Sequence, residues 1–131
     1  MNRIVEELKK VGVFYLASID KDSPRVRPFG SICEIENHAY ICTGNFKDVY
    51  KQLSNNPNIE LSGMYADGSW IRVRCKVVED NRLEIQQKVL DDPTGPSSLY
   101  KAGDGVFVTY RLENIKALKY SFGKDPEVIK E

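Results

Sequence analysis

Arg25 and Arg27 lie in the segment SPRVRPFG, which directly follows the apolar run VGVFYLASI. Side chains two residues apart in a β-strand point to the same face, so the two guanidinium groups would lie side by side. Such a pair can bind a phosphate or a carboxylate through paired, charge-assisted hydrogen bonds. Taken alone, the pair is better explained by a strand whose arginines face solvent than by an anion site, because arginine is usually exposed. In that alternative Val26 and Pro28 face the core.

A second row of positive charge follows in the segment SWIRVRCKV. Alternation along a strand places its apolar residues on one face and its aromatic and cationic residues on the other. The second face contains Trp70, Arg72, Arg74 and Lys76. An aromatic ring beside cations can stack on a planar, negatively charged ligand, or hold RNA bases and phosphates. The alternative is a solvent-exposed face whose charge is balanced by nearby acids.

The segment CTGNFKDVYKQL joins the end of a strand to a helix that we expect at residues 46–56, with Asn45 as its cap. Free backbone N–H groups at a helix start favour phosphate binding. Lys47 and Lys51 are one helical turn apart and add positive charge. Asp48 is a counter-signal, because a carboxylate in the first turn can satisfy the helix dipole itself. The spacing is not that of a P-loop.

The periodicity of the rest of the chain predicts strands joined by hairpins, with short helices between them. We expect helices at residues 4–11, at 46–56 and from an Asn81 cap to about 90–92. We expect strands at 13–19, 25–36 with a bend at 29–31, 39–44, 58–66, 69–79, and two strands within 106–122 separated by a turn at Glu113-Asn114. The run 13–19 is apolar on both faces, which is typical of a strand covered on both sides. Six or seven such strands predict an antiparallel sheet closed into a barrel.

Two segments stand apart from this pattern. Residues 91–105, DDPTGPSSLYKAGDG, form a long loop, and loops of this length inside a compact domain are often functional. The tail after Gly123 is polar and is expected to fray. The single histidine, His38, falls in a predicted hairpin turn and is interpreted as solvated.

Composition limits the classes of function. A chain of 131 residues fits one domain, residues 1–131, and its 19 basic and 19 acidic residues give a net charge of +0. This balance argues against general nucleic-acid or membrane binding. Cys33, Cys42 and Cys75 lack CxxC spacing, so we expect no metal site and reduced thiols in a cytoplasmic protein. No signal peptide and no apolar run of the ~20 residues that a membrane helix needs is found.

Three segments together resemble the pyridoxamine-phosphate-oxidase-like FMN-binding split-barrel superfamily: FYLASIDKDSPRVRPFG, CTGNFKDVYKQLSNNPNIELSG and GSWIRVRCKV. The similarity extends from about Val11 to about Val78. It implies a mainly β fold with short helices, a six- to seven-stranded antiparallel split β-barrel. It further implies a homodimer that holds FMN at the subunit interface, and a small flavin-dependent oxidoreductase.

The resemblance also implies which residues contact the cofactor. The arginine-bearing strand would line the phosphate, the ribityl chain and the ring edge, the following strand end and helix start would add further contacts, and a tryptophan would approach the ring from the other subunit. The residues implied are Arg25, Val26, Arg27, Pro28, Phe29, Cys42, Thr43, Lys47, Lys51, Trp70 and Arg72. Cys42, beside this site, could be redox-active.

The chain departs from the true pyridoxamine-phosphate oxidases in two places. It ends in SFGKDPEVIKE rather than in an arginine- and histidine-containing segment, and Asp48-Val49 stands where some relatives carry Arg-Lys. The resemblance therefore implies FMN binding without naming a substrate or a catalytic residue. Two alternatives stay open: a non-catalytic flavin- or haem-binding sensor or carrier on the same fold, and a small RNA-binding barrel.

Overall fold

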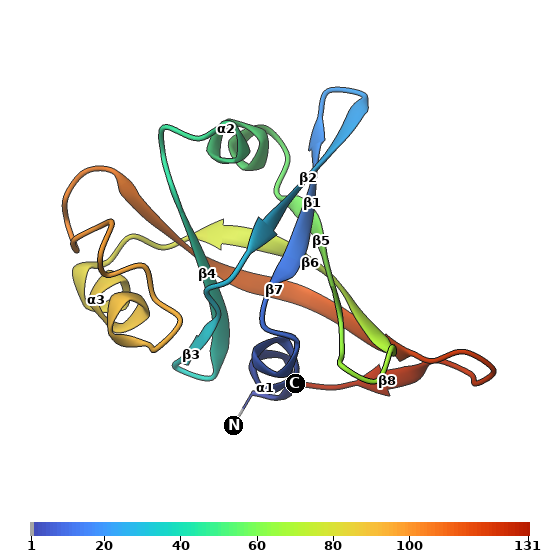
Figure 1. The fold of residues 1–131 in the computed structure, drawn as a ribbon. Coiled ribbons are helices and arrows are strands. Elements are labelled where there is room, and N and C mark those ends of the chain that lie inside the picture. The colour runs from blue at the N-terminus through green and yellow to red at the C-terminus, as the bar shows by residue number, and fades with distance from the viewer. Residues whose placement is uncertain (1) are drawn as a thin grey trace.

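The computed structural model describes residues 2–131, and in them eight strands form one antiparallel sheet (Figure 1). The strand order is β2-β1-β5-β6-β7-β4-β3, with β8 paired to β7. The strands are β1 (Phe14–Asp20), β2 (Ser23–Phe29), β3 (Cys33–Ile35), β4 (His38–Gly44), β5 (Asn58–Met64), β6 (Trp70–Glu79), β7 (Phe107–Tyr120) and β8 (Glu127–Ile129). The predicted antiparallel split barrel is confirmed, with eight strands in place of six or seven.

Three helices cover the sheet: α1 (Arg3–Val11), α2 (Asp48–Asn55) and α3 (Leu83–Asp91). Figure 1 places α1 near the C-terminus, α2 at the opposite end beside β1 and β2, and α3 beside β3 and β4. The apolar stripe of α2, Val49 and Leu53, is buried in the barrel core. Each helix thus closes a part of the curved sheet that no strand covers.

Burial divides the interior into two apolar clusters on the two sides of β4. The larger cluster fills the barrel and contains buried residues of α1, β1, β5 and β6 such as Leu8, Leu16 and Leu61. The smaller cluster packs α3 against the other side of β4, and includes Tyr40 and Phe107. Alternation along β4 directs Ile41 to the first cluster and Tyr40 to the second.

The predicted single strand at residues 25–36 is wrong, because the structure divides it into β2 and β3. Strand β2 ends at Phe29 and pairs only with β1, at one edge of the sheet. Residues 30–32 carry the chain across the open side of the barrel to β3, at the opposite edge. The predicted bend at 29–31 is therefore a crossing between the two edges. It leaves one edge of β2 without a neighbouring strand.

Two predictions near the C-terminus are also wrong. No turn separates strands at Glu113-Asn114; instead β7 is continuous, and Asn114 adopts a φ of 53° where the pairing with β6 shifts register. One extra residue absorbed in this way is a β-bulge. The tail does not fray throughout, because residues 127–129 form β8 and bury Ile129 against the core.

Neither predicted helix cap forms. Helix α2 begins at Asp48 after Lys47, and Asn45 instead donates a hydrogen bond to the carbonyl of Gly105 at 2.9 Å. Helix α3 begins at Leu83, and the Asn81 side chain accepts a hydrogen bond from the Thr109 backbone N–H at 2.9 Å. Both asparagines bind residues distant in sequence, which local spacing does not reveal.

The expectation that both faces of the first strand are covered is also wrong within one chain. Phe14, Leu16 and Ser18 are buried on the inner face of β1, but Tyr15 and Ile19 on the outer face are exposed.

Among the described residues no helix is long and apolar enough to cross a membrane.

Asp80, directly after β6, joins three parts of the fold. Its Oδ2 accepts a hydrogen bond from the Tyr40 hydroxyl of β4 at 2.9 Å and pairs with Nη2 of Arg82 at 2.9 Å. Arg111 of β7 lies 3.9 Å from the same oxygen. The hydrogen bonds from Arg82, with that from Tyr40, lower the pKa of Asp80 to about 2 despite partial desolvation. The carboxylate therefore stabilises the fold in its charged form.

We expect Asp80→Asn to lower the free energy of unfolding at pH 7 by about 2 kcal/mol, since a shift of one pKa unit corresponds to about 1.4 kcal/mol. Because the folded pKa lies below the unfolded value, this contribution is present above about pH 4 and is lost as the pH falls toward 2. Urea unfolding at pH 7 and at pH 2.5 measures the effect. Equal losses at the two pH values would contradict the assignment.

Candidate functional site

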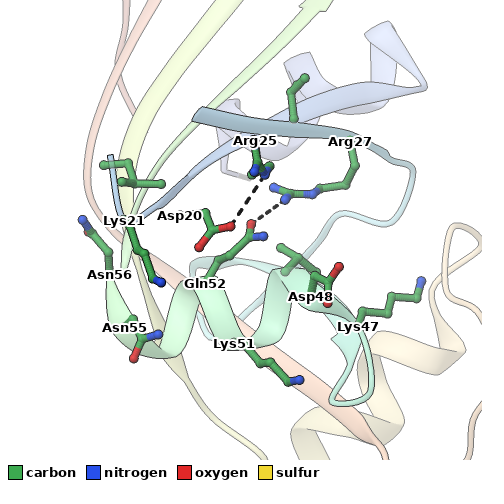
Figure 2. A pocket seen from close by; sticks show the side chains of 13 residues that line it. Asp20, Lys21, Arg25, Arg27, Lys47, Asp48, Lys51, Gln52, Asn55 and Asn56 are labelled. Atoms are coloured by element: carbon green, nitrogen blue, oxygen red, sulfur yellow. Dashed lines mark hydrogen bonds and ion pairs between the residues drawn. The ribbon is translucent and has the colours of Figure 1, made fainter. Parts of the chain in front are cut away.

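A groove of about 850 Å³ runs between β2 and α2 (Figure 2). Arg25 and Arg27 extend from β2 toward the helix, as their shared face predicts, and Lys47 and Gln52 line the opposite wall. The groove lies on the inner face of the edge strand β2, with α2 on the other side of the opening. Cationic side chains of two elements therefore converge on one opening.

Arg27 is half-buried and held entirely by neutral groups. Its Nη1 donates to Ser18 Oγ at 2.8 Å and to the Leu16 carbonyl at 3.2 Å, and its Nη2 donates to Gln52 Oε1 at 2.6 Å. Ser18 Oγ also donates to Gln52 Oε1 at 2.6 Å. In residues 2–131 no carboxylate lies at ion-pair distance from this guanidinium. Its orientation is fixed, but none of these residues forms an ion pair that neutralises its charge.

Burial is the main cause that lowers the pKa of Arg27, and the charge of Arg25 lowers it further. The carboxylate of Asp48 acts in the opposite direction. A guanidinium remains protonated at neutral pH all the same. An anion in the groove would relieve both unfavourable effects, so the electrostatics of Arg27 favour a negatively charged ligand.

Arg25 differs from Arg27 in having an acidic partner. Its Nε lies 3.6 Å from Asp20 Oδ2, and its Nη1 donates to the carbonyl of Pro24 at 3.3 Å. The side chain is exposed at the outer end of the groove. Arg25 can contribute to the potential of the groove, but part of its charge is already neutralised.

The helix wall carries charges of both signs. Lys47 precedes the first turn of α2, and Lys51 follows one turn later; both line the groove. Asp48, in the first turn, also lines it (Figure 2). The groove is therefore less positive than a count of its cations suggests, and its selectivity depends on where each charge lies.

A second cavity of about 360 Å³ adjoins the groove, and Arg27, Lys47 and Val49 line both. It lies between the end of β2, the end of β4 and the loop at residues 92–106. Its further walls are Pro28, Phe29, Gly30, Ser31, Cys42, Thr43, Thr94, Pro96, Leu99 and Tyr100. Ser31 is only 9% exposed, and its Oγ has no hydrogen-bond partner among the described residues. A buried, unpaired hydroxyl in a cavity wall is a donor available to a ligand.

Cys42 lines this cavity but is not prepared for redox chemistry. Burial raises the pKa of the Cys42 thiol. The Ser31 hydroxyl, which lies near the thiol without a well-formed hydrogen bond to it, and the charge of Lys47 lower this pKa less. Burial likewise raises the pKa of Cys33 and of Cys75 to about 12. Since the thiolate is the reactive form, none of the three is activated in the folded chain.

Trp70 and Arg72 do not reach the groove of their own chain. They lie on the outer face of β6, where Trp70 stacks on Tyr120 with ring centroids 5.6 Å apart. Arg72 Nε is 2.7 Å from Glu60 Oε2. Val26 and Pro28 are also exposed, so the alternative in which they face the core while the arginines face solvent is wrong.

Sequence reasoning missed Ser18, Gln52 and Tyr100. Ser18 had a usable signal, because it occupies an inward position in the alternation of β1 where an apolar residue is expected. Gln52 had a weaker one, since it lies one turn after Asp48 on the predicted helix. Tyr100 lies in the loop that was expected to be functional, but nothing in the loop's composition distinguishes this residue.

Comparison with solved structures finds a close match along nearly the whole chain. A NimC/NimA family protein from Clostridium acetobutylicum is 37% identical, with a TM-score of 0.93 over 98% of this chain and 90% of that one. General Stress Protein 26 from Bacillus anthracis is 16% identical, with a TM-score of 0.72 over 98% and 99%. A pyridoxamine 5'-phosphate oxidase-related, FMN-binding protein from Nostoc punctiforme is 14% identical, with a TM-score of 0.62 over 97% and 91%.

These matches confirm the pyridoxamine-phosphate-oxidase-like fold. The fold alone does not choose a cofactor, since it also occurs in an F420 reductase, 19% identical with a TM-score of 0.57, and in a haem-binding protein from Mycobacterium smegmatis, 14% identical with a TM-score of 0.68.

Sequence comparison with curated proteins gives a different kind of match. A ToxR-activated gene A lipoprotein from Vibrio cholerae is 34% identical in an alignment of 112 residues that covers 78% of this chain. The chain spans only 11% of the length of that relative, and the same match occurs in a second strain. No protein-family model matches the chain.

Proposed function

The chain belongs to the NimC/NimA family, and from the geometry of its groove we propose that it binds FMN and acts as a small flavin-dependent oxidoreductase. In this proposal the groove holds the phosphate and the adjoining cavity holds the ring. FMN supplies hydride or electron transfer when bound, so the protein must mainly bind, orient and shield it.

The observation that carries the proposal is the state of Arg27. A half-buried guanidinium fixed by Ser18 and Gln52, with no carboxylate partner in the described residues, is poised for an anion from outside the chain. Charge-assisted hydrogen bonds from guanidinium to phosphate are among the strongest in proteins. Lys47, which lines both the groove and the cavity, would contact the same phosphate.

The cavity suits the other end of the molecule. Phe29, Pro96 and Leu99 give it apolar walls, and the unpaired Ser31 hydroxyl gives it a buried polar group. Ligand sites commonly combine apolar walls with a few placed polar groups. Because Arg27 and Lys47 border both spaces, one ligand can extend from the groove into the cavity. Pro28, Cys42 and Thr43 then lie along it, as the resemblance implies.

The outer face of the sheet supports a homodimer. Tyr15 on β1 is 51% exposed, Val26 on β2 is 66% exposed, and Met64 on β5 and Phe122 after β7 are exposed as well. Exposed apolar residues gathered on one face of a sheet are typical of an interaction site. Trp70 and Arg72 share this outer face, so in a dimer they could approach the groove of the partner. We further propose that residues 1–131 form a single domain of this kind and that the protein is cytoplasmic.

Adding FMN to the purified protein tests cofactor binding. We expect bound, coloured flavin, and we expect the double variant Arg25→Ala/Arg27→Ala to weaken FMN by more than ~2 kcal/mol, about 30-fold, because the phosphate loses its charged donors. Quenching of FMN fluorescence measures the affinity. Arg3→Ala, an exposed arginine of α1, is the matched control and should bind as the unmodified chain does. Unchanged affinity in the double variant would show that neither arginine holds the phosphate.

Turnover separates the oxidoreductase from a non-catalytic flavin carrier. We expect the FMN-loaded protein to be reduced by NADH or NADPH without oxygen and to be reoxidised when an acceptor is added. Loss and recovery of the flavin absorbance measure both half-reactions, with free FMN at the same concentration as the control. If neither nucleotide reduces the bound flavin, the oxidoreductase proposal is wrong and the non-catalytic carrier remains.

A charge on the outer face should prevent dimerisation. We expect Tyr15→Asp to convert a dimer to a monomer, because it would bury a carboxylate in an apolar contact. Sedimentation velocity at micromolar concentration measures the change, and Leu83→Asp, at an exposed leucine on α3, is the control. A monomeric unmodified chain would contradict the proposed assembly.

A further inference from the structure

The loop at residues 92–106 is a fixed wall of the cavity, because both of its ends are anchored. Thr94 Oγ1 accepts a hydrogen bond from the Ile32 backbone N–H at 3.1 Å, and Asp92 pairs with Lys9 of α1 at 2.8 Å. At the other end, Asp104 Oδ1 accepts hydrogen bonds from the backbone of Val106 and Phe107, each at 2.8 Å. The residues between these anchors are therefore held over the end of β4.

Tyr100 is held in this wall by a backbone hydrogen bond and by ring stacking. Its backbone N–H donates to the Pro96 carbonyl at 3.2 Å, and its ring stacks on Phe107 with centroids 5.0 Å apart. Its hydroxyl lies directly over Gly44, since a Cβ built on Gly44 would be 2.6 Å from the Tyr100 oxygen. A glycine at the end of β4 leaves the space that this hydroxyl occupies.

The Tyr100 hydroxyl lines the cavity without a hydrogen-bond partner in the part of the chain that the structure describes. Burial is the main cause that raises its pKa, with Cys42 and Asp104 adding to the effect, so the phenol keeps its proton at neutral pH. Ser31 Oγ, also unpaired, lines the same cavity. The cavity thus has two free hydroxyl groups between apolar walls, which suits a planar ring with oxygen or nitrogen acceptors.

We infer that Tyr100 is a ligand-contacting residue of this site, whose hydroxyl donates a hydrogen bond to a carbonyl oxygen or ring nitrogen of the flavin. The inference rests on the proposed function and goes beyond it by assigning a polar contact to the loop at residues 92–106. A phosphate bound at Arg27 would direct the ring into the adjoining cavity, which Tyr100 borders. A hydrogen bond to a ring acceptor alters the electronic environment of the flavin as well as its affinity.

Tyr100→Phe tests the contact, because it removes the hydroxyl and keeps the ring that stacks on Phe107. We expect FMN affinity to fall about three- to tenfold, the effect of one hydrogen bond. We also expect the visible absorption bands of bound FMN to shift. The matched control is Tyr110→Phe, since the Tyr110 hydroxyl is likewise unpaired but is buried in the barrel core away from the cavity. It should change neither quantity.

The outcomes separate the two proposals. If the unmodified chain binds FMN and Arg25→Ala/Arg27→Ala weakens it, but Tyr100→Phe leaves the affinity and the spectrum unchanged, only the Tyr100 contact is overturned. If the unmodified chain binds no FMN, the proposed function fails, and this inference fails with it. A change in affinity without a spectral shift also contradicts the contact, because loss of wall packing alone would produce it. Thermal unfolding confirms that each variant is folded.

Discussion

The hydrogen bonds between Arg27, Ser18 and Gln52 connect the three elements on which the site depends. Ser18 comes from β1, Arg27 from β2 and Gln52 from α2, and each is within 2.8 Å of another member. Strand β2 lies at the edge of the sheet and pairs only with β1, and on its inner face this polar contact joins it to α2. The same contact holds α2 opposite β2 across the groove and fixes the position of the Arg27 guanidinium. The same hydrogen bonds of neutral side chains to Arg27 therefore contribute both to the stability of the fold and to the proposed ligand site.

Much of the strand order along the chain follows from the sequence, because alternation and turn residues are local signals. The shared face of Arg25 and Arg27 and the cationic face of β6 both follow from the period of a strand. What failed depends on contacts distant in sequence. The crossing at residues 30–32 follows from sheet closure, and Asn45 and Asn81 bind distant backbone groups instead of capping helices. Ser18 and Gln52 matter only once the fold brings them to Arg27.

In the candidate site, too, the features that the sequence did not predict depend on contacts between residues distant in sequence. Residue types predicted an anion site near Arg27 and Lys47, and the structure brings these two to one groove. Sequence reasoning treated Trp70 and Arg72 as part of the same surface, but one chain places them on its outer face, beside Tyr120 and Glu60. The resemblance implied Pro28, Phe29, Cys42 and Thr43 of the adjoining cavity, but nothing in the sequence indicated that the loop at residues 92–106 closes it, because only the fold brings that loop to β2 and β4.

The open edge that makes room for the groove also carries a risk, since an unpaired strand can recruit a strand from another molecule. Strand β2 contains two prolines, Pro24 and Pro28. Proline has no backbone N–H to donate and is tolerated in sheets mainly at their edges, so each one removes a donor that an incoming strand would need. The exposed charge of Arg25 between them adds a further obstacle. The sequence that builds the anion groove therefore also protects this edge against aggregation through strand addition.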